Sequence, residues 1–210
     1  MVNFVEIKEA TMNGEQHTVA ELTREAIKQG APAEQIIQDS FISAMSIVGQ
    51  KFGAGEIYIP EMLRAARAMK FGMEVLSPLI VGDKVHTLAT VVIGTVKGDM
   101  HDIGKNLVGM MLEGSGFEVV DLGIDVPVIK FVDAVKQYQP QFLALSALLT
   151  TTMKQMKMVI DALEEAGLRQ QVNVFVGGAP VNRSFADEIG ADGHGVNAGQ
   201  AAESMKEMLN

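Results

Sequence analysis

The sequence predicts an α/β protein in two parts, an N-terminal helical bundle followed by a doubly wound parallel sheet. Three observations support this prediction. Residues 1–84 carry apolar side chains at helical spacing. Residues 85–210 alternate β-branched apolar segments with helix-like segments, which is the pattern of a parallel sheet covered by helices. Between the two parts stands Gly82-Asp83-Lys84, which we interpret as a hinge.

The first part is expected to contain three long helices, with a short one at its start. The first long helix covers 18–29 and ends at Gly30. The second covers 32–52, with a proline in its first turn, and ends at the glycine-rich break 53–55. The third covers 60–76, and apolar residues continue beyond it. Three such helices predict a small antiparallel bundle.

The second part is expected to alternate strands and helices throughout, with a short fifth strand near its end. The expected strands cover 88–96, 117–122, 142–148, 172–176 and 191–195, and the expected helices cover 105–114, 127–138, 152–166, 181–189 and 198–209. Alternation at this spacing predicts a flavodoxin-like or Rossmann-like sheet. The predicted domains are therefore a helical domain over 1–84 and a sheet domain over 85–210.

The composition excludes several classes of protein. The chain has 210 residues, a formal net charge of −9 and no cysteine. This charge, without any basic stripe, argues against a nucleic-acid partner. The lack of cysteine excludes disulfides, thiolate metal sites and cysteine catalysis. The polar N-terminus is unlike a signal peptide, and no apolar run reaches the ~20 residues that a membrane span needs. We therefore expect a cytoplasmic protein that binds neither nucleic acid nor a membrane.

The most informative segment is 98–106, with the sequence GDMHDIGKN, between an expected strand and an expected helix. In it Asp99 precedes His101 by two residues, and Gly104 follows the histidine by three. Ligands of open α/β sheets bind at the loops that follow the strands. A histidine beside a carboxylate is a common way to orient a metal ligand. The segment predicts such a histidine, although an Asp-x-His pair also occurs in ordinary loops.

The loops after the other strands share small and hydroxyl-bearing residues. Because these loops gather at one edge of the sheet, they predict a polar slot with little side-chain bulk, suited to an elongated polar ligand. Helix capping and turn formation explain each residue type taken alone. The residues are Ser146, Leu148, Thr150 and Thr152 after the third strand, Gly177 and Gly178 after the fourth, and Gly193, His194 and Gly195 after the fifth.

Three parts of these loops resemble the signature of cobalamin-binding domains. They are Asp99-x-His101-x-x-Gly104, Ser146-x-Leu148 and Gly177-Gly178, in that order and at fitting intervals. The helical part resembles the cap module that precedes such domains in methionine synthase and in small corrinoid proteins of anaerobic methyl transfer, through FGAGEIYIP over 52–60. The resemblance covers nearly the whole chain. In size and layout the chain is similar to the corrinoid proteins of methylamine, methanol or methoxy-compound methyltransferase systems.

The resemblance implies that the cofactor is cobalamin or a related corrinoid, with His101 as the axial ligand to cobalt in place of the cofactor's own base. Asp99 would accept a hydrogen bond from the other ring nitrogen, and Thr152 would hydrogen-bond Asp99. Proton uptake by the His-Asp pair would favour ligand release as the cofactor passes between its methylcobalamin and cob(I)alamin states. The same loop would contribute further cofactor contacts from Met100, Asp102, Ile103 and Gly104.

The resemblance also implies where the nucleotide tail of the cofactor lies. Ser146, Leu148 and Thr150 would line the tail pocket, and the glycines at 177–178 would let the backbone approach the tail. Residues 193–195 would lie near its far end, where family members often carry an aromatic ring in place of His194. The tail would thus occupy the predicted slot.

Three apolar residues of the helical part, Phe52, Ile59 and Met62, match cap positions that shield the methyl face in the family. An apolar cover suits a methyl–cobalt bond and a strongly nucleophilic Co(I), because both must be kept from side reactions. Ordinary packing in the core of the bundle is the alternative interpretation of the same three residues.

The expected function is that of a methyl carrier. The protein would accept a methyl group on cobalt from a substrate:corrinoid methyltransferase and pass it to a second methyltransferase, with tetrahydrofolate or a thiol as acceptor. A reductive activase is a further expected partner, and the chain alone would have little activity. The sequence leaves methylamines, betaines, methanol and aryl methyl ethers open as methyl donors.

Two other classes of function compete with the carrier. One keeps the cofactor, as the cobalamin-binding subunit of a radical isomerase or as a cobalamin-dependent regulatory protein; the helical cap and the lack of a basic DNA-binding helix weigh against these. The other is a metal-dependent hydrolase using Asp99, His101 and Asp102. It lacks further histidines nearby in the sequence, and a catalytic metal needs several protein ligands.

Overall fold

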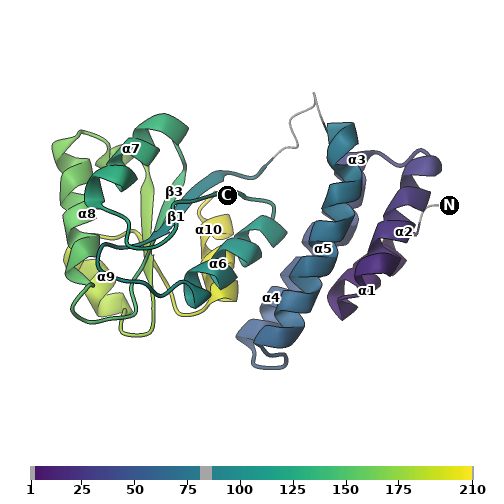
Figure 1. Cartoon of the computed structure of the whole chain (residues 1–210), viewed down its shortest axis with the longest axis horizontal. Helices are drawn as coiled ribbons and strands as arrows, with labels where there is room; N and C mark the ends of the chain where they lie inside the picture. Colours follow the sequence, from purple (N-terminus) through teal and green to yellow (C-terminus); the bar gives the residue numbers. More distant parts are fainter. Residues whose placement is uncertain (1–2, 81–86, 210) are drawn as a thin grey trace. The chain divides into compact units, whose positions relative to one another are not determined.

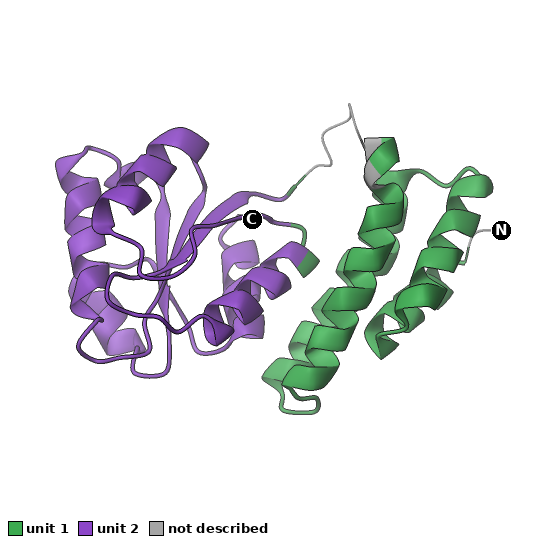
Figure 2. Cartoon of the chain, viewed as in Figure 1, with its two compact units in different colours: residues 1–87, 114–116 green, residues 88–113, 117–210 purple. Residues whose placement is uncertain are grey.

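The computed structural model describes residues 3–80 and 87–209, and the chain divides into two compact units (Figure 1). One unit comprises 1–87 with 114–116, and the other comprises 88–113 with 117–210 (Figure 2). The expected hinge at 82–84 and the expected boundary between 84 and 85 lie outside the described residues.

The described part of the first unit is helical. Its longest helix, α5, lies against α1, α2 and α4. The expected second helix, over 32–52, is divided into a short α3, a π-helical segment and α4. The bounds are Phe4–Asn13 for α1, Gln16–Lys28 for α2, Ala33–Ile36 for α3, Ile37–Ile42 for the π-helical segment, Ser43–Gly53 for α4 and Ile59–Ile80 for α5.

The π-helical segment contributes a large aromatic side chain to the core of this unit. Phe41 is fully buried. A Cβ atom added at Gly72 of α5 would lie 2.2 Å from Phe41 Cζ, so the ring occupies the space of a side chain at that position. Ser40 of the same segment donates its hydroxyl to the carbonyl of Phe4 at 3.2 Å, which ties it to α1. Close packing of this kind fixes how α5 meets the rest of the bundle.

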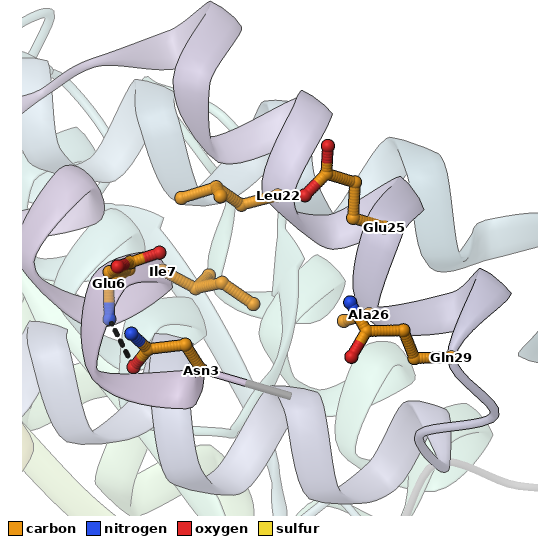
Figure 3. A pocket seen from close by; sticks show the side chains of 7 residues that line it. All are labelled: Asn3, Glu6, Ile7, Leu22, Glu25, Ala26 and Gln29. Atoms are coloured by element: carbon orange, nitrogen blue, oxygen red, sulfur yellow. Dashed lines mark hydrogen bonds between the residues drawn. The ribbon is translucent and has the colours of Figure 1, made fainter. Parts of the chain in front are cut away.

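A pocket of about 290 Å³ opens between α1 and α2 (Figure 3). At its edge the side chain of Asn3 caps α1 by accepting a hydrogen bond from the backbone N–H of Glu6 at 3.3 Å. None of the site residues predicted from the sequence lines this pocket, whose lining residues are Asn3, Glu6, Ile7, Leu22, Glu25, Ala26 and Gln29.

The second unit is a five-stranded, fully parallel sheet with the strand order β2-β1-β3-β4-β5. This is the flavodoxin-like order, and the predicted fold class is confirmed. Bounds of the strands are Thr90–Thr95, Glu118–Asp121, Phe142–Ser146, Asn173–Gly177 and Gly193–Gly195 for β1 to β5, and of the helices Ile103–Gly114, Val128–Tyr138, Lys154–Glu165, Arg183–Ile189 and Ala198–Glu207 for α6 to α10, with a 3₁₀ turn over Arg169–Gln171.

Helices cover both faces of this sheet, with α7, α8 and α9 on one side and α6 and α10 on the other (Figure 1). On the first side, apolar residues of the central strands pack with those of α7, α8 and α9 in one buried cluster. Elsewhere in the core, Phe142 makes edge-to-face contacts with Phe117 and Phe175, at centroid distances of 6.1 and 5.8 Å. Burial on both faces explains why the central strands β1, β3 and β4 are mostly apolar runs rather than alternating ones.

The expected strands and helices of the second unit are all present, with ends that differ by a few residues. Gly193, His194 and Gly195 form β5 itself, so the expectation that they belong to a loop after the fifth strand is wrong. The helix expected from 152 begins at Lys154, which leaves Thr152 in the loop. None of the described helices has the length and apolar character needed to cross a bilayer.

Candidate functional site

The loop that carries His101 follows β1 at the switch point of the sheet. β1 pairs with β2 on one side and with β3 on the other, so the chain runs in opposite directions from this point. Ligands of open α/β sheets bind in the crevice at such a point, outside the carboxyl ends of the strands. The loops after β1 and β3 meet there, and one buried carboxylate, that of Asp99, connects them.

Asp99 is fully buried and accepts five hydrogen bonds. Its Oδ1 accepts from His101, at 3.1 Å from the backbone N and 2.7 Å from the ring Nδ1. Its Oδ2 accepts from the backbone N–H groups of Leu148 and Leu149, at 2.8 and 3.1 Å, and from the hydroxyl of Thr152 at 2.7 Å. Asp99 is therefore a structural link that joins the loop after β3 to the loop and the ring of His101.

The protonation state of Asp99 follows from these contacts. Burial raises the pKa of this carboxyl group, but the hydrogen bonds from Thr152, His101 and Leu148 outweigh burial and hold the pKa well below its ordinary range. An ionised carboxylate only accepts hydrogen bonds, so Nδ1 of His101 carries the hydrogen between them. In the neutral ring, Nε2 then has the free lone pair.

The ring of His101 is 51% exposed. Among the residues that the structure describes, none is hydrogen-bonded to its Nε2. A ring that is held at one nitrogen and open at the other is the arrangement of an oriented metal ligand.

The hydroxyl of Thr152 lies near two acceptors but has one hydrogen to donate. It is 2.7 Å from Asp99 Oδ2 and 2.8 Å from the carbonyl oxygen of Leu149. The ionised carboxylate is the stronger acceptor, so the hydroxyl donates to Asp99. Thr152 thus completes a row of three hydrogen-bonded side chains with His101 and Asp99.

The strand register places small residues in one row across the sheet. Thr95 of β1 pairs with Ser146 of β3, Ser146 pairs with Gly177 of β4, and Gly177 pairs with Gly195 of β5. All four residues end their strands, so the row lies at the carboxyl edge of the sheet, where the loop of His101 begins. Thr150 follows in the next loop and is exposed. This continuous row of small residues would form the floor of the slot expected from the sequence.

The glycines of the predicted slot fall into two groups. Side chains at Gly178, Gly193 and Gly195 would collide with the protein, because an added Cβ would lie 1.8 Å from the Ala147 carbonyl oxygen, 2.3 Å from the Phe175 ring and 2.8 Å from Ala201 Cβ. Internal packing therefore accounts for these three glycines.

Gly104 and Gly177 form the second group. A Cβ at Gly104 would have no neighbour within 4 Å, and one at Gly177 would make only an ordinary contact of 3.5 Å. Packing within the chain gives no reason for glycine at either position. The space beside both is open for a ligand.

His194 makes a contact within the chain. Its Nε2 lies 3.0 Å from the carbonyl oxygen of Val181, in the turn after β4. This bond holds the ring between β5 and that turn, so one ring nitrogen is occupied.

Exposed apolar side chains surround the polar groups at this edge of the sheet. Met100, Ile103 and Leu148, which the sequence predicts as cofactor contacts, are all exposed. Three more exposed apolar residues, which follow β2, β3 and β5 at the same edge, were missed: Ile124, Leu149 and Val196. Their chemical type is the only signal in the sequence, and many exposed apolar residues have no ligand.

Behind the histidine loop, the buried amine of Lys105 forms another connection that sequence reasoning missed. It forms an ion pair with Asp121 at the end of β2 and donates to Asn106 Oδ1 at 2.7 Å. Asn106 in turn donates to Asp102 at 3.1 Å. These contacts anchor the start of α6, and they give the carboxylate of Asp102 a hydrogen-bond partner one helical turn farther along the chain.

The three predicted cap residues differ in exposure. Ile59 is 42% exposed, Phe52 is half-buried and Met62 is fully buried. Ile59 and Phe52 thus have surface available to a ligand, whereas the burial of Met62 favours the core interpretation. Their shielding role stays a prediction.

The donor set fits a corrinoid better than a metal ion bound by protein alone. In the described residues, no three side chains of His, Cys, Asp or Glu come together around a common point. The site instead offers one imidazole nitrogen, a surround of exposed apolar side chains and a floor of small residues. A large, largely apolar ring with a polar tail matches these three features, since it needs a single axial ligand from the protein.

Comparisons with known proteins agree with this fit. The family model described as "B12 binding domain" matches residues 89–203, and a second model with the same description matches 4–77. The chain is 45% identical to the trimethylamine corrinoid protein of Methanosarcina barkeri, over 97% of this chain and 94% of that protein. It is 40% identical to dimethylamine corrinoid protein 1 of Methanosarcina mazei, over 97% and 94% of the two chains.

Solved structures extend the likeness to the whole fold. A cobalamin-binding protein from Desulfitobacterium hafniense is similar with a TM-score of 0.83 and 33% identity, covering 100% of both chains. The methanol:cobalamin methyltransferase complex MtaBC from Methanosarcina barkeri contains a chain similar with a TM-score of 0.89 and 34% identity, covering 98% of this chain and 79% of that one. On this evidence from sequence and fold, the chain belongs to the B12-binding family of corrinoid proteins.

Proposed function

We propose that this protein is the methyl carrier of a methyltransferase system, with a corrinoid held over the carboxyl edge of its sheet by His101. The single observation that carries the proposal is the hydrogen bond of 2.7 Å between His101 Nδ1 and the buried carboxylate of Asp99. It leaves Nε2 free, on a loop that follows β1 at the same edge of the sheet as the row of small residues. When bound, the corrinoid supplies a cobalt centre that takes up and releases a methyl group.

His101 and Asp99 would control the hold of the protein on that centre. A neutral imidazole with its hydrogen on Nδ1 offers the Nε2 lone pair, whereas a second proton on the ring occupies that lone pair. The carboxylate of Asp99 stabilises either form of the ring, because it accepts from Nδ1–H in both. Ligation by His101 would therefore respond to proton uptake at Nε2 while Asp99 stays ionised.

The remaining predicted residues would bind the rest of the cofactor. Gly104 and Gly177 leave space that packing does not fill, and Ser146 offers a hydroxyl in the same row. The other proposed contacts are Met100, Asp102, Ile103, Leu148, Thr150, Thr152, Gly178, Gly193, His194 and Gly195, with Phe52, Ile59 and Met62 of the helical domain over 1–84 as the cover of the domain over 85–210.

The proposed partners are two methyltransferases. One would load the carrier from a methylamine, since relatives at 40–45% identity are named as trimethylamine and dimethylamine corrinoid proteins. The other would unload it to tetrahydrofolate or a thiol. A reductive activase would return an oxidised cofactor to its active state, and the cytoplasm would be the place of all three encounters.

The first test is reconstitution of the full chain with hydroxocobalamin, followed by removal of excess cofactor. We expect one corrinoid per chain and, after reduction to Co(II), an electron paramagnetic resonance spectrum whose nitrogen splitting changes when the histidines carry ¹⁵N. The variant His101→Gly should keep the fold and some cofactor but lose that splitting. The matched control is His17→Gln, on the exposed face of α2, which should leave the spectrum unchanged.

Methyl transfer then tests the carrier role. The reduced protein is mixed with trimethylamine or dimethylamine and the corresponding methyltransferase, and the visible spectrum is followed for methylation of the cofactor. If the wild-type chain retains no corrinoid, the whole proposal is wrong. Retained, histidine-ligated corrinoid that no methylamine system methylates would leave cofactor binding standing and reject the methylamine donor.

A further inference from the structure

Asp125, in the loop between β2 and α7, contacts three consecutive residues that precede His101: Lys97, Gly98 and Asp99. Its Oδ1 accepts from the backbone N–H of Gly98 at 2.7 Å, and its Oδ2 accepts from Lys97 Nζ at 3.0 Å. Its own backbone N–H donates to the carbonyl of Asp99 at 3.0 Å. Asp125 thus forms hydrogen bonds with three consecutive residues, 97, 98 and 99, which lie 26 or more residues before it in the sequence.

The backbone of Asp125 has an uncommon conformation. Its φ of 52° lies in the left-handed region, where Asp and Asn are among the few non-glycine residues found. Gly98, its hydrogen-bond partner, also has a left-handed φ, of 83°. Gly98 adopts this conformation without strain, whereas Asp125 carries a small cost that its hydrogen bonds to the other loop offset.

The contacts of Asp125 continue directly to the proposed ligand. Asp99 is the next residue after Gly98, and its carboxylate holds both the backbone and the ring of His101. Thr95 holds the other side of the same turn by donating its hydroxyl to the carbonyl of His101 at 2.9 Å. Displacement of Gly98 would therefore move Asp99 and, through it, the ring.

We propose that Asp125 is a positioning residue for the proposed cobalt ligand: by accepting the hydrogen bond of Gly98, its carboxylate sets the turn that presents Asp99 and His101. This inference rests on the proposed function. The contacts also favour the charged carboxylate, since the Gly98 hydrogen bond and Lys97 hold the pKa of Asp125 below its ordinary value. The ion pair with Lys97 is exposed on both sides and contributes little by itself, so the bond to Gly98 carries the effect.

Three variants separate the possible contributions of this residue. Asp125→Gly accepts the left-handed φ but removes the acceptor. Asp125→Asn tolerates the same φ and keeps an oxygen for Gly98, but removes the charge. Lys97→Met removes the ion pair and leaves the bond to Gly98 in place, so it serves as the control.

The experiment measures histidine ligation in the full chain reconstituted with hydroxocobalamin, from the nitrogen splitting of the Co(II) form. In Asp125→Gly we expect the ratio of ligated to unligated cofactor to fall on the order of tenfold, which is the lower end of the contribution of a hydrogen bond to a charged group. Asp125→Asn should stay within about threefold of wild type, because a neutral acceptor retains much of the bond. Lys97→Met should match the wild type.

A second readout uses the chain without cofactor. Amide hydrogen exchange of His101 and Leu148, whose N–H groups donate to Asp99, should be faster in Asp125→Gly while helix content and the thermal midpoint stay near wild type. Unchanged ligation in Asp125→Gly would overturn the inference and leave the proposed function intact. Loss of ligation in Asp125→Asn as severe as in Asp125→Gly would overturn the role of the Gly98 bond. If the wild type does not retain corrinoid, the proposed function itself is contradicted.

Discussion

The backbone N–H of Leu148 donates to the carboxylate of Asp99 at 2.8 Å, across the switch point of the sheet and 49 residues along the chain. The same carboxylate holds the ring of His101 at 2.7 Å. One buried group therefore joins the loop of the proposed ligand to the loop that borders the proposed tail slot. A change in the charge of Asp99 must be felt in both loops, and the first predictions follow from this link.

Asp99→Asn should destabilise the chain and disturb the histidine. Both carboxylate oxygens face donors, so the amide NH₂ of asparagine must point its hydrogens at one set of them. Leaving buried donors without an acceptor costs about 1–3 kcal/mol of unfolding free energy. Urea unfolding of the cofactor-free chain measures this cost, and the Co(II) spectrum of the reconstituted chain measures the loss of histidine ligation.

The control for this change is Asp102→Asn, three residues farther along the same loop. Asp102 is exposed and accepts one bond from Asn106 at 3.1 Å, so its replacement should alter the unfolding free energy by less than about 0.5 kcal/mol. Equal effects of the two substitutions would contradict the special position of Asp99.

The stability contributed by Asp99 should depend on pH in a definite direction. Its pKa is lowered in the folded chain, so at pH values below the ordinary carboxyl pKa of about 3.9 the unfolded chain binds a proton that the folded chain does not. The contribution is thus fully present above that value and is lost as the pH falls toward the folded pKa. Urea unfolding from about pH 5 to about pH 3 should show the difference between wild type and Asp99→Asn shrinking. A constant difference would mean that the carboxylate is not the cause.

Thr152→Val should destabilise the chain by removing a hydrogen bond to Oδ2 of Asp99, the carboxylate oxygen that does not contact His101. Valine has nearly the shape of threonine but cannot donate to Asp99 Oδ2, so a hydrogen bond to a charged acceptor, with a typical value of about 1.5–3 kcal/mol, is lost from a buried position. The pKa of Asp99 should rise as a result. Thr152→Ser keeps the hydroxyl and should recover most of the unfolding free energy. A double-mutant cycle with Asp99→Asn should show strong coupling, since the two side chains share one bond.

The sequence predicted most of the second unit because local patterns determine its elements. Apolar β-branched runs, a helix-starting proline and turn glycines mark most of its strands and helices. The π-helical segment was not predictable in this way, since the apolar spacing around Phe41 is that of an ordinary helix. The segment is explained by tertiary packing, because the Phe41 ring fills the space beside Gly72 of α5, which is 31 residues farther along the chain.

The proposed site shows the same division. His101 and Asp99 are two residues apart, so their hydrogen bond is a local event that the sequence can suggest. Asp125 and Lys105 were missed because their partners are distant in the sequence: Gly98, in the loop after β1, is 27 residues from Asp125, and Asp121, at the end of β2, is 16 residues from Lys105. Only the strand order β2-β1-β3 brings these loops together.

Alanine substitutions at the glycines of the proposed slot should separate the positions that matter for folding from those that matter for cofactor binding. Gly178→Ala should reduce the unfolding free energy by at least about 3 kcal/mol, because its φ of 130° is strained for alanine and the new Cβ would lie 1.8 Å from the Ala147 carbonyl oxygen. Gly104→Ala and Gly177→Ala meet no such obstacle. In the chain without cofactor they should change the unfolding free energy by less than about 1 kcal/mol, with Gly104→Ala on the stabilising side because it lies within α6.

The same two variants should bind hydroxocobalamin more weakly than wild type, because each new methyl group enters space that no side chain of the protein fills and that the proposed ligand needs. Equilibrium dialysis gives the dissociation constants, and urea unfolding of the same preparations gives the stabilities. Gly167→Ala, at a helix end with a φ of 70° and no neighbour within 4 Å, is the control: it should lower stability slightly and leave binding unchanged. Wild-type affinity in both Gly104→Ala and Gly177→Ala would place the ligand elsewhere on the sheet, since a cofactor lying in this slot could not avoid both added methyl groups.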